Sequence, residues 1–137
     1  MRREHDTFHL LETSIEEVLA ALAAGRITSV ELTARYLSRI GAFDREGARL
    51  CAIPVLNPDA LAMAAESDRR WREGTARPLE GVPFTVKDSY MVQGLTVASG
   101  SPAFQNLIAQ RDAFSVEKLR EAGAVLIGKT NMPPMAD

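Results

Sequence analysis

Two apolar runs joined through a helical segment constrain this chain more than any other feature. The runs are residues 82–86 and 124–127, and residues 112–122, which Gly123 follows, are predicted to form the helix between them. The second run, Ala-Val-Leu-Ile, is too continuous for a strand with one face in water, so we expect it to be buried on both faces. Strands connected through a helix pair in parallel, and this βαβ unit predicts an α/β fold.

Two further helices are predicted near the N-terminus. Thr13 to Glu16 matches a capping box, and Gly25 is the expected stop of the helix that follows. Thr28 to Glu31 repeats the signal, and its helix is predicted to end at Gly41. Apolar residues recur at helical spacing in both segments: Ile15, Val18, Leu19 and Leu22 in the first, and Leu32, Tyr36, Leu37 and Ile40 in the second.

A third helix is predicted to begin at Asn57-Pro58, which has the form of an N-cap followed by proline at the first helical position, and to stop at Gly74. Its many alanines predict close packing against a neighbouring element. The residues that we expect to face the core are Leu61, Ala64 and Ala65.

The segments on either side of residue 50 are less regular. Residues 51–56 are predicted to form a strand, and Pro54 favours an edge position because proline has no amide to donate to a neighbouring strand. Residues 41–50 are a possible hinge.

Composition excludes several classes of protein. The formal net charge is −2, so no basic surplus points to nucleic acid or to an anionic membrane surface. No apolar run approaches the roughly 20 residues that a membrane-spanning helix needs. The single cysteine, Cys51, has no internal partner for a disulfide, which fits a reducing compartment. We therefore expect a cytoplasmic protein that binds neither nucleic acid nor membrane and holds no cofactor.

Lys87 stands where the first apolar run meets a long loop. Open α/β sheets bind their ligands beyond the carboxyl ends of the strands. A lysine at such an edge can act as a base when apolar surroundings favour its neutral form. Asp88 would oppose this if its carboxylate faced the amine, but successive residues that leave a strand point to opposite sides. The alternative is an ordinary solvated lysine.

The connection from Lys87 to Arg111 is long and has no strong helical period. Loops of this length inside a compact domain are commonly functional or disordered. The backbone amides of residues 99–101, Ser-Gly-Ser, could bind an anion, although turn formation explains the same residues and is favoured. The serines that follow Lys87 include no convincing nucleophile; those considered are Ser99, Ser101 and Ser115.

Two patterns that carry chemistry in other proteins are rejected here. Residues 123–130 match the phosphate-binding loop letter for letter, but the four variable positions, Ala-Val-Leu-Ile, predict a strand, and Pro133 and Pro134 oppose the helix that such a loop must open. His5 and His9 lie four residues apart in a polar terminal segment without a third ligand, so no metal site is predicted.

Several motifs, in one order along the chain, resemble the amidase signature family. Residues 79–88 (LEGVPFTVKD) resemble its Gly-Val-Pro … Val-Lys-Asp segment, and residues 94–101 resemble a glycine- and serine-containing loop. Residues 119–133 resemble the segment that ends in Gly-Lys-Thr-Asn-Met-Pro. The upstream helices also follow the family's order, so the resemblance covers nearly the whole chain. Ser89 and Pro134 depart from residues common in the family, which leaves the substrate class open.

This resemblance implies a hydrolase of carboxamide C–N bonds that uses a lysine, a bridging serine with a cis peptide bond and a nucleophilic serine. Lys87 matches the catalytic lysine, and both serines are expected after Asp137. The implied fold is α/β, with a mixed sheet flanked by helices, and residues 1–137 would be an incomplete N-terminal part of one such domain. By analogy the end of the chain begins the wall of a substrate pocket, with candidates Thr130, Asn131 and Met135.

Two alternatives stay open at the level of sequence. One is the amidotransferase branch of the family, whose amide-cleaving subunit releases ammonia for amidation on transfer RNA and needs a partner subunit. The other is a truncated homologue without catalysis. The expected ligand of the parent enzyme is a small-molecule amide, and the two N-terminal amphipathic helices could serve a homodimer.

Overall fold

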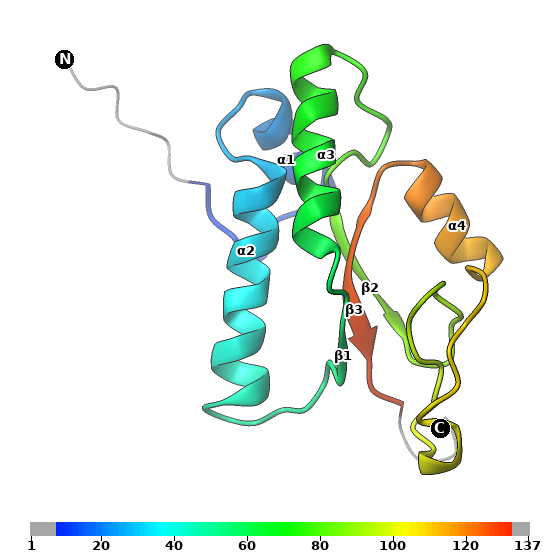
Figure 1. Cartoon of the computed structure of the whole chain (residues 1–137). Coiled ribbons are helices and arrows are strands. Elements are labelled where there is room, and N and C mark those ends of the chain that lie inside the picture. Colours follow the sequence, from blue (N-terminus) through cyan, green and yellow to red (C-terminus); the bar gives the residue numbers. More distant parts are fainter. Residues whose placement is uncertain (1–7, 133–137) are drawn as a thin grey trace.

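A computed structural model describes residues 8–132 and has an α/β architecture, with a small mixed sheet flanked by helices (Figure 1). This is the fold class that the sequence predicts. The elements, in chain order, are α1 (Ile15–Ala23), α2 (Ser29–Arg39), a π-helical turn (Ile40–Arg45), β1 (Val55–Leu56), α3 (Ala60–Glu73), β2 (Pro83–Lys87), a 3-10 turn (Pro102–Phe104), α4 (Phe114–Glu121) and β3 (Val125–Thr130).

The last strand in the chain occupies the middle of the described sheet, whose order is β1-β3-β2. β2 and β3 run parallel, with Pro83 opposite Val125 and Lys87 opposite Thr130. β1 pairs antiparallel with β3 and forms an edge of this sheet, as Pro54 indicated. The predicted βαβ unit is confirmed. Residues 123–130 are confirmed as a strand rather than a phosphate loop, and β3 continues to Thr130, beyond the predicted end at residue 127.

Neighbouring residues of β3 pack into different cores because side chains alternate along a strand. Leu126 joins Val92 and the α4 residue Val116. Ile127 joins Ile40 and the α3 residue Ala60. Figure 1 shows the same division, with α2 and α3 on one side of the sheet and α4 on the other. β3 is therefore buried on both faces, as its continuous apolar sequence predicts.

The first helix begins one residue later than predicted. Ser14, rather than Thr13, is the N-cap, and it forms a full capping box with Glu17 in which the two backbone–side chain hydrogen bonds measure 3.2 and 2.8 Å. The Thr13 hydroxyl instead donates to the carbonyl of His9. Both Thr13 and Ser14 can cap a helix, so local preference alone does not choose between them. For α2 the capping box of Thr28 and Glu31 is confirmed.

The second helix does not stop at Gly41, which corrects the prediction. The chain continues through the π-helical turn to Arg45. The carboxylate of Asp44 then accepts from the amides of Ala52, at 2.5 Å, and Ile53, at 3.3 Å. These bonds secure the segment proposed as a hinge. They also explain why the strand predicted over residues 51–56 is reduced to two residues, since the amides of Ala52 and Ile53 go to Asp44.

α3 ends at Gly74, as predicted, in a left-handed conformation with φ +69°. Its predicted start is wrong by two residues, because the N-cap is Asp59 rather than Asn57 and the first helical residue is Ala60 rather than Pro58. The Asn57 side chain instead accepts from the amide of Asp59 at 3.1 Å and donates to the carbonyl of Leu126 at 2.8 Å, so it joins the start of the helix to β3. The predicted core face is partly wrong, because Leu61 is 45% exposed and Ala65 is also exposed. The helix contacts α2, and its buried face is a narrow stripe of small residues: Ala60, Ala64 and Ser67.

A buried carboxylate, that of Glu80, lies at the amino ends of the two parallel strands. Glu80 accepts from Ser67 Oγ at 2.7 Å and from Arg77 Nε at 2.6 Å, and its side chain has no exposed surface. Burial raises the pKa of Glu80, but the hydrogen bonds from Arg77 and Ser67 outweigh it, and the net pKa is lowered. The carbonyl of Glu80 also accepts from Trp71 Nε1 at 3.1 Å.

None of the helices within residues 8–132 is long and apolar enough to cross a membrane.

The close approach of β1 to β3 predicts that Gly128 does not tolerate a side chain. A Cβ at Gly128 would lie 2.6 Å from the carbonyl oxygen of Val55, whereas a Cβ at Gly41 would meet nothing within 4 Å. Gly128→Ala should lower the free energy of unfolding by about 1–3 kcal/mol, as overpacked sites do. Gly41→Ala should leave it unchanged or slightly higher. Urea unfolding followed by circular dichroism measures both, and a Gly128→Ala midpoint at or above that of the wild type would contradict the close contact.

The Glu80 cluster predicts a stability loss that depends on pH. Glu80→Gln should cost about 2–4 kcal/mol at pH 7, because Arg77 then loses a charged partner that is buried beside it. A carboxylate with a lowered pKa in the folded state contributes stability above its unfolded pKa, and this contribution is lost as the pH falls through the folded pKa. The difference between wild type and Glu80→Gln should therefore stay constant from pH 7 to about pH 4.3, the ordinary pKa of a glutamate, and shrink below it.

The matched control is Glu66→Gln on α3. Glu66 is 45% exposed and pairs with Arg69 at the surface, where solvent screens the pair, so its loss should cost much less than that of Glu80. Thermal melts of the three proteins at several pH values provide the test. A gap between wild type and Glu80→Gln that stays constant with pH would refute the ionic role of Glu80.

Candidate active site

Lys87 is the last residue of β2 and lies opposite Thr130 at the carboxyl ends of two parallel strands. Its side chain is exposed, while that of the next residue, Asp88, is buried. The two side chains therefore separate as the strand ends, which confirms the expectation that the Asp88 carboxylate faces away from Lys87. Among residues 8–132, no segment buries the Lys87 side chain.

The fully buried lysine of this region is Lys129, not Lys87. Its Nζ lies 3.0 Å from Oδ1 of Asp88, and neither side chain is more than 5% exposed. Nζ also donates to the carbonyl of Asp88, at 3.2 Å, and to the carbonyl of Thr96. Asp88 Oδ1 accepts no hydrogen bond of good angle within the described residues, so its attraction to Lys129 is chiefly that of one charge for another.

Two of the three predicted pocket residues lie at the same end of the sheet. Thr130 donates from its hydroxyl to the carbonyl of Val86 at 3.4 Å, and its own carbonyl accepts from the Asp88 amide at 2.9 Å. Asn131 is exposed, and its side chain donates to the carbonyl of Cys51 at 3.3 Å. Polar groups from β2, β3 and the segment before β1 thus meet at one edge. Met135 lies outside the described residues.

The long connection after β2 returns to this edge. Thr96 and Ile108 form a β-bridge within it, and a Cβ at Gly100 would lie 3.2 Å from the Cβ of Met132, just after β3. Ser101 caps the 3-10 turn by accepting from the Ala103 amide at 3.3 Å, so the turn interpretation of this segment is supported. The other two serines considered are exposed, Ser99 in the loop and Ser115 on α4.

The main apolar hollow of the described chain does not include Lys87. It is an open groove of about 600 Å³ between α2 and β2, lined among others by Tyr36, Ile40 and Phe84. Its lining extends along β2 only as far as Thr85. The candidate site is therefore assigned from the strand ends and their polar groups, since the groove is mainly apolar and does not reach Lys87. No group of three metal-binding side chains occurs among residues 8–132.

The Lys129–Asp88 pair is the feature that sequence reasoning missed. A signal for half of it exists, because a lysine next to an apolar run that is buried on both faces is almost never buried without a partner. Once residues 123–130 are interpreted as a strand rather than a phosphate loop, the sequence suggests no role for Lys129. The partner cannot be named from the sequence, since 41 positions separate Lys129 from Asp88.

Comparison with known proteins places these residues in a larger enzyme family. Residues 31–136 match the Amidase family. The chain is 41% identical to the A component of the glutamyl-tRNA(Gln) amidotransferase of Thioalkalivibrio sulfidiphilus over 125 residues, which are 91% of this chain and 25% of that protein. It is 41% identical to the same component of the Geobacter sulfurreducens enzyme over 128 residues, or 93% of this chain and 26% of that protein.

Solved structures give the same assignment. The native peptide amidase of Stenotrophomonas maltophilia superposes with a TM-score of 0.86 and 44% identity, over 89% of this chain and 25% of that one. An amidase family protein of Bacillus anthracis superposes with a TM-score of 0.84 and 30% identity, over 90% of this chain and 25% of that one. The chain spans about a quarter of the length of the curated relatives it matches. By sequence and by structure, this chain belongs to the Amidase family of amide-acting enzymes, those with the amidase signature.

Proposed function

We propose that the protein hydrolyses carboxamide C–N bonds and that Lys87 is the base of a Ser-cisSer-Lys triad. The observation that carries the proposal is the position of Lys87 at the carboxyl end of β2, with its side chain exposed and the neighbouring Asp88 carboxylate engaged by Lys129. The amidase signature motifs support the same role for Lys87. The resemblance puts the bridging and the nucleophilic serine after residue 137.

The proposed chemistry follows the logic of an activated nucleophile without histidine. Neutral Lys87 accepts a proton through the bridging serine, and the second serine attacks the amide carbonyl. The C–N bond breaks, the amine or ammonia leaves with a proton, and an acyl-enzyme forms. Water then attacks the ester and releases the carboxylic acid. Thr130 and Asn131, at the same edge as Lys87, are proposed to line the substrate pocket together with Met135.

A second candidate is the amidotransferase reaction, in which the ammonia released from an amide passes to a partner subunit for transfer-RNA-linked amidation. The similarity to the A components of amidotransferases favours it, whereas the similarity to peptide amidase favours a free-standing hydrolase with a small-molecule amide substrate. Purified complete gene product given glutamine and a C-terminally amidated peptide separates the two. A homodimer and a cytoplasmic location belong to the hydrolase proposal. An amidotransferase subunit that needs its partner would cleave neither amide alone, so a non-catalytic truncated homologue is the outcome only if neither amide is cleaved when the partner subunits are also present.

Replacement of Lys87 tests its role as base. In the complete gene product, Lys87→Ala should lower kcat/KM by roughly 10²–10⁴-fold, and by more if the triad acts as a unit. Lys87→Arg should be nearly as damaging, because a guanidinium does not lose its proton in proteins. Steady-state kinetics on the preferred amide provide the measurement.

Lys118→Arg is the matched control for these variants. Lys118 is 52% exposed on α4 and pairs with Glu121 at the surface, so arginine there should leave the kinetics unchanged. If Lys87→Arg likewise keeps near-normal activity, Lys87 is a solvated surface lysine and not the base.

The proposed triad also predicts the behaviour of residues 1–137 produced alone. Because the triad needs two serines that the resemblance puts after residue 137, this chain should hydrolyse no simple aryl amide. Release of the arylamine by the purified chain is the measurement. Turnover that disappears in Lys87→Ala would show that the chain itself supplies the nucleophile, and the proposed triad would be wrong.

A further inference from the structure

The carboxylate of Asp88 poses a problem for a base at Lys87. The two residues are adjacent at the end of β2, and a carboxylate within about 4–6 Å of an amine favours the protonated amine. A lysine that is to accept a proton needs the opposite influence. In the structure the Asp88 side chain points into the protein and that of Lys87 is exposed.

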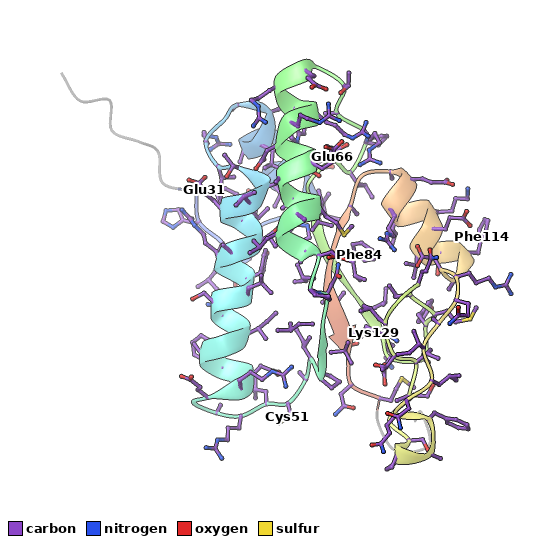
Figure 2. The ribbon with its side chains drawn as sticks, in the orientation of Figure 1. Glu31, Cys51, Glu66, Phe84, Phe114 and Lys129 are labelled. Carbon is purple, nitrogen blue, oxygen red and sulfur yellow. The ribbon has the colours of Figure 1, made fainter. Side chains whose placement is uncertain are left out.

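Lys129 provides the partner that keeps Asp88 in this position. An ammonium group has three donors. Here one Nζ contact is the Asp88 carboxylate at 3.0 Å, and the others are the carbonyls of Asp88, at 3.2 Å, and Thr96. All three contacts belong to the chain that follows β2. In Figure 2 the Lys129 side chain extends from β3 towards that segment.

The pair costs free energy unless it does something that an apolar pair would not do. Burying two charges is expensive, and well-packed apolar residues of the same size are often at least as stable. Lys129 has no exposed surface, and its Nζ lies 3.0 Å from Oδ1 of Asp88, so both charges are buried together. What the pair does achieve is a neutral sum of charges one residue away from Lys87.

We infer that Lys129 is a positioning residue for the amidase reaction: it holds Asp88 as half of a buried neutral ion pair, so that the carboxylate neither contacts Lys87 nor favours its protonated form. This inference rests on the proposed role of Lys87 as base. It adds a function for the lysine of the Gly-Lys-Thr-Asn segment, beyond joining β3 to the chain that follows β2.

Removal of either partner alone should change the pH at which Lys87 becomes neutral, and the two removals should change it in opposite directions. Lys129→Met leaves the negative charge of Asp88, which favours protonated Lys87, so neutral amine is reached at higher pH. Asp88→Asn leaves the positive charge of Lys129, which disfavours protonated Lys87, so neutral amine is reached at lower pH. The double variant removes both charges, keeps similar side-chain shapes and should restore the wild-type behaviour. A purely structural pair predicts loss of folded protein without shifts of opposite sign.

Other charged groups around the end of β2 stay constant across these variants. The turn after β2 contributes the titratable Tyr90, which is 44% exposed. The segment beside Asn131 contributes Asp44, which is buried and lies 3.9 Å from Arg45 Nε. Differences among the variants therefore report on the Lys129–Asp88 pair.

The experiment uses the complete gene product and two measurements. The first is the pH dependence of kcat/KM, whose acidic limb reports the proton that the base must lose. The second is the pH dependence of acetylation of Lys87 by acetic anhydride, followed by mass spectrometry against a small added amine, which needs no turnover. Both profiles are expected to shift upward in pH in Lys129→Met and downward in Asp88→Asn.

Lys118→Met is the control, because it makes the same substitution in an ion pair on α4, with Glu121 at 2.6 Å. It should shift neither profile. Acetylation midpoints of Lys87 that coincide in wild type, both single variants and the double variant would overturn the inference. Acetylation that shifts while the kcat/KM profile does not would instead overturn Lys87 as base. If Lys129→Met does not fold, the downward shift in Asp88→Asn and its reversal in the double variant decide the matter.

Discussion

A buried ammonium group in the central strand joins the parts of this structure that matter for function. Lys129 belongs to β3, which pairs with both β1 and β2, and its Nζ contacts the turn after β2 and the long connection that follows. Because a buried charge without a partner is costly, these contacts must form together. The strand, the turn and the loop at the candidate site are thereby fixed as one unit.

The sequence predicted elements whose signals are local. The capping box at Thr28, the left-handed stop at Gly74 and the continuous apolar β3 need only neighbouring residues to be recognised. It failed where distant residues decide. The π-helical turn after α2 includes Asp44, whose carboxylate accepts from amides eight and nine positions away. Leu61 is exposed because α3 contacts its neighbours through small residues. The apolar character of a side chain does not by itself show which face of a helix is buried.

The candidate site divides in the same way. Lys87 could be placed at the carboxyl end of its strand from the sequence, whereas Thr130 was proposed by analogy with the family, and the structure pairs the two. The family motif then suggested what Lys87 does. The roles of Lys129 and Asp88 depend on a contact across 41 positions, and no single-sequence pattern specifies such a partner. The alternation of side chains at the strand end did predict that Asp88 would point away from Lys87. It did not predict which residue Asp88 would contact.

A buried carboxylate lies at each end of the β2–β3 pair. The two carboxylates differ in how completely they are hydrogen-bonded. At the amino ends, both oxygens of Glu80 are hydrogen-bonded by Ser67 and Arg77. At the carboxyl ends, Asp88 has an ionic contact to Lys129 but an Oδ1 without a well-directed donor. A fully satisfied carboxylate stabilises the fold. The Asp88–Lys129 pair also joins parts of the fold, and because it lies beside an exposed lysine it has the further role in charge control that we infer for it.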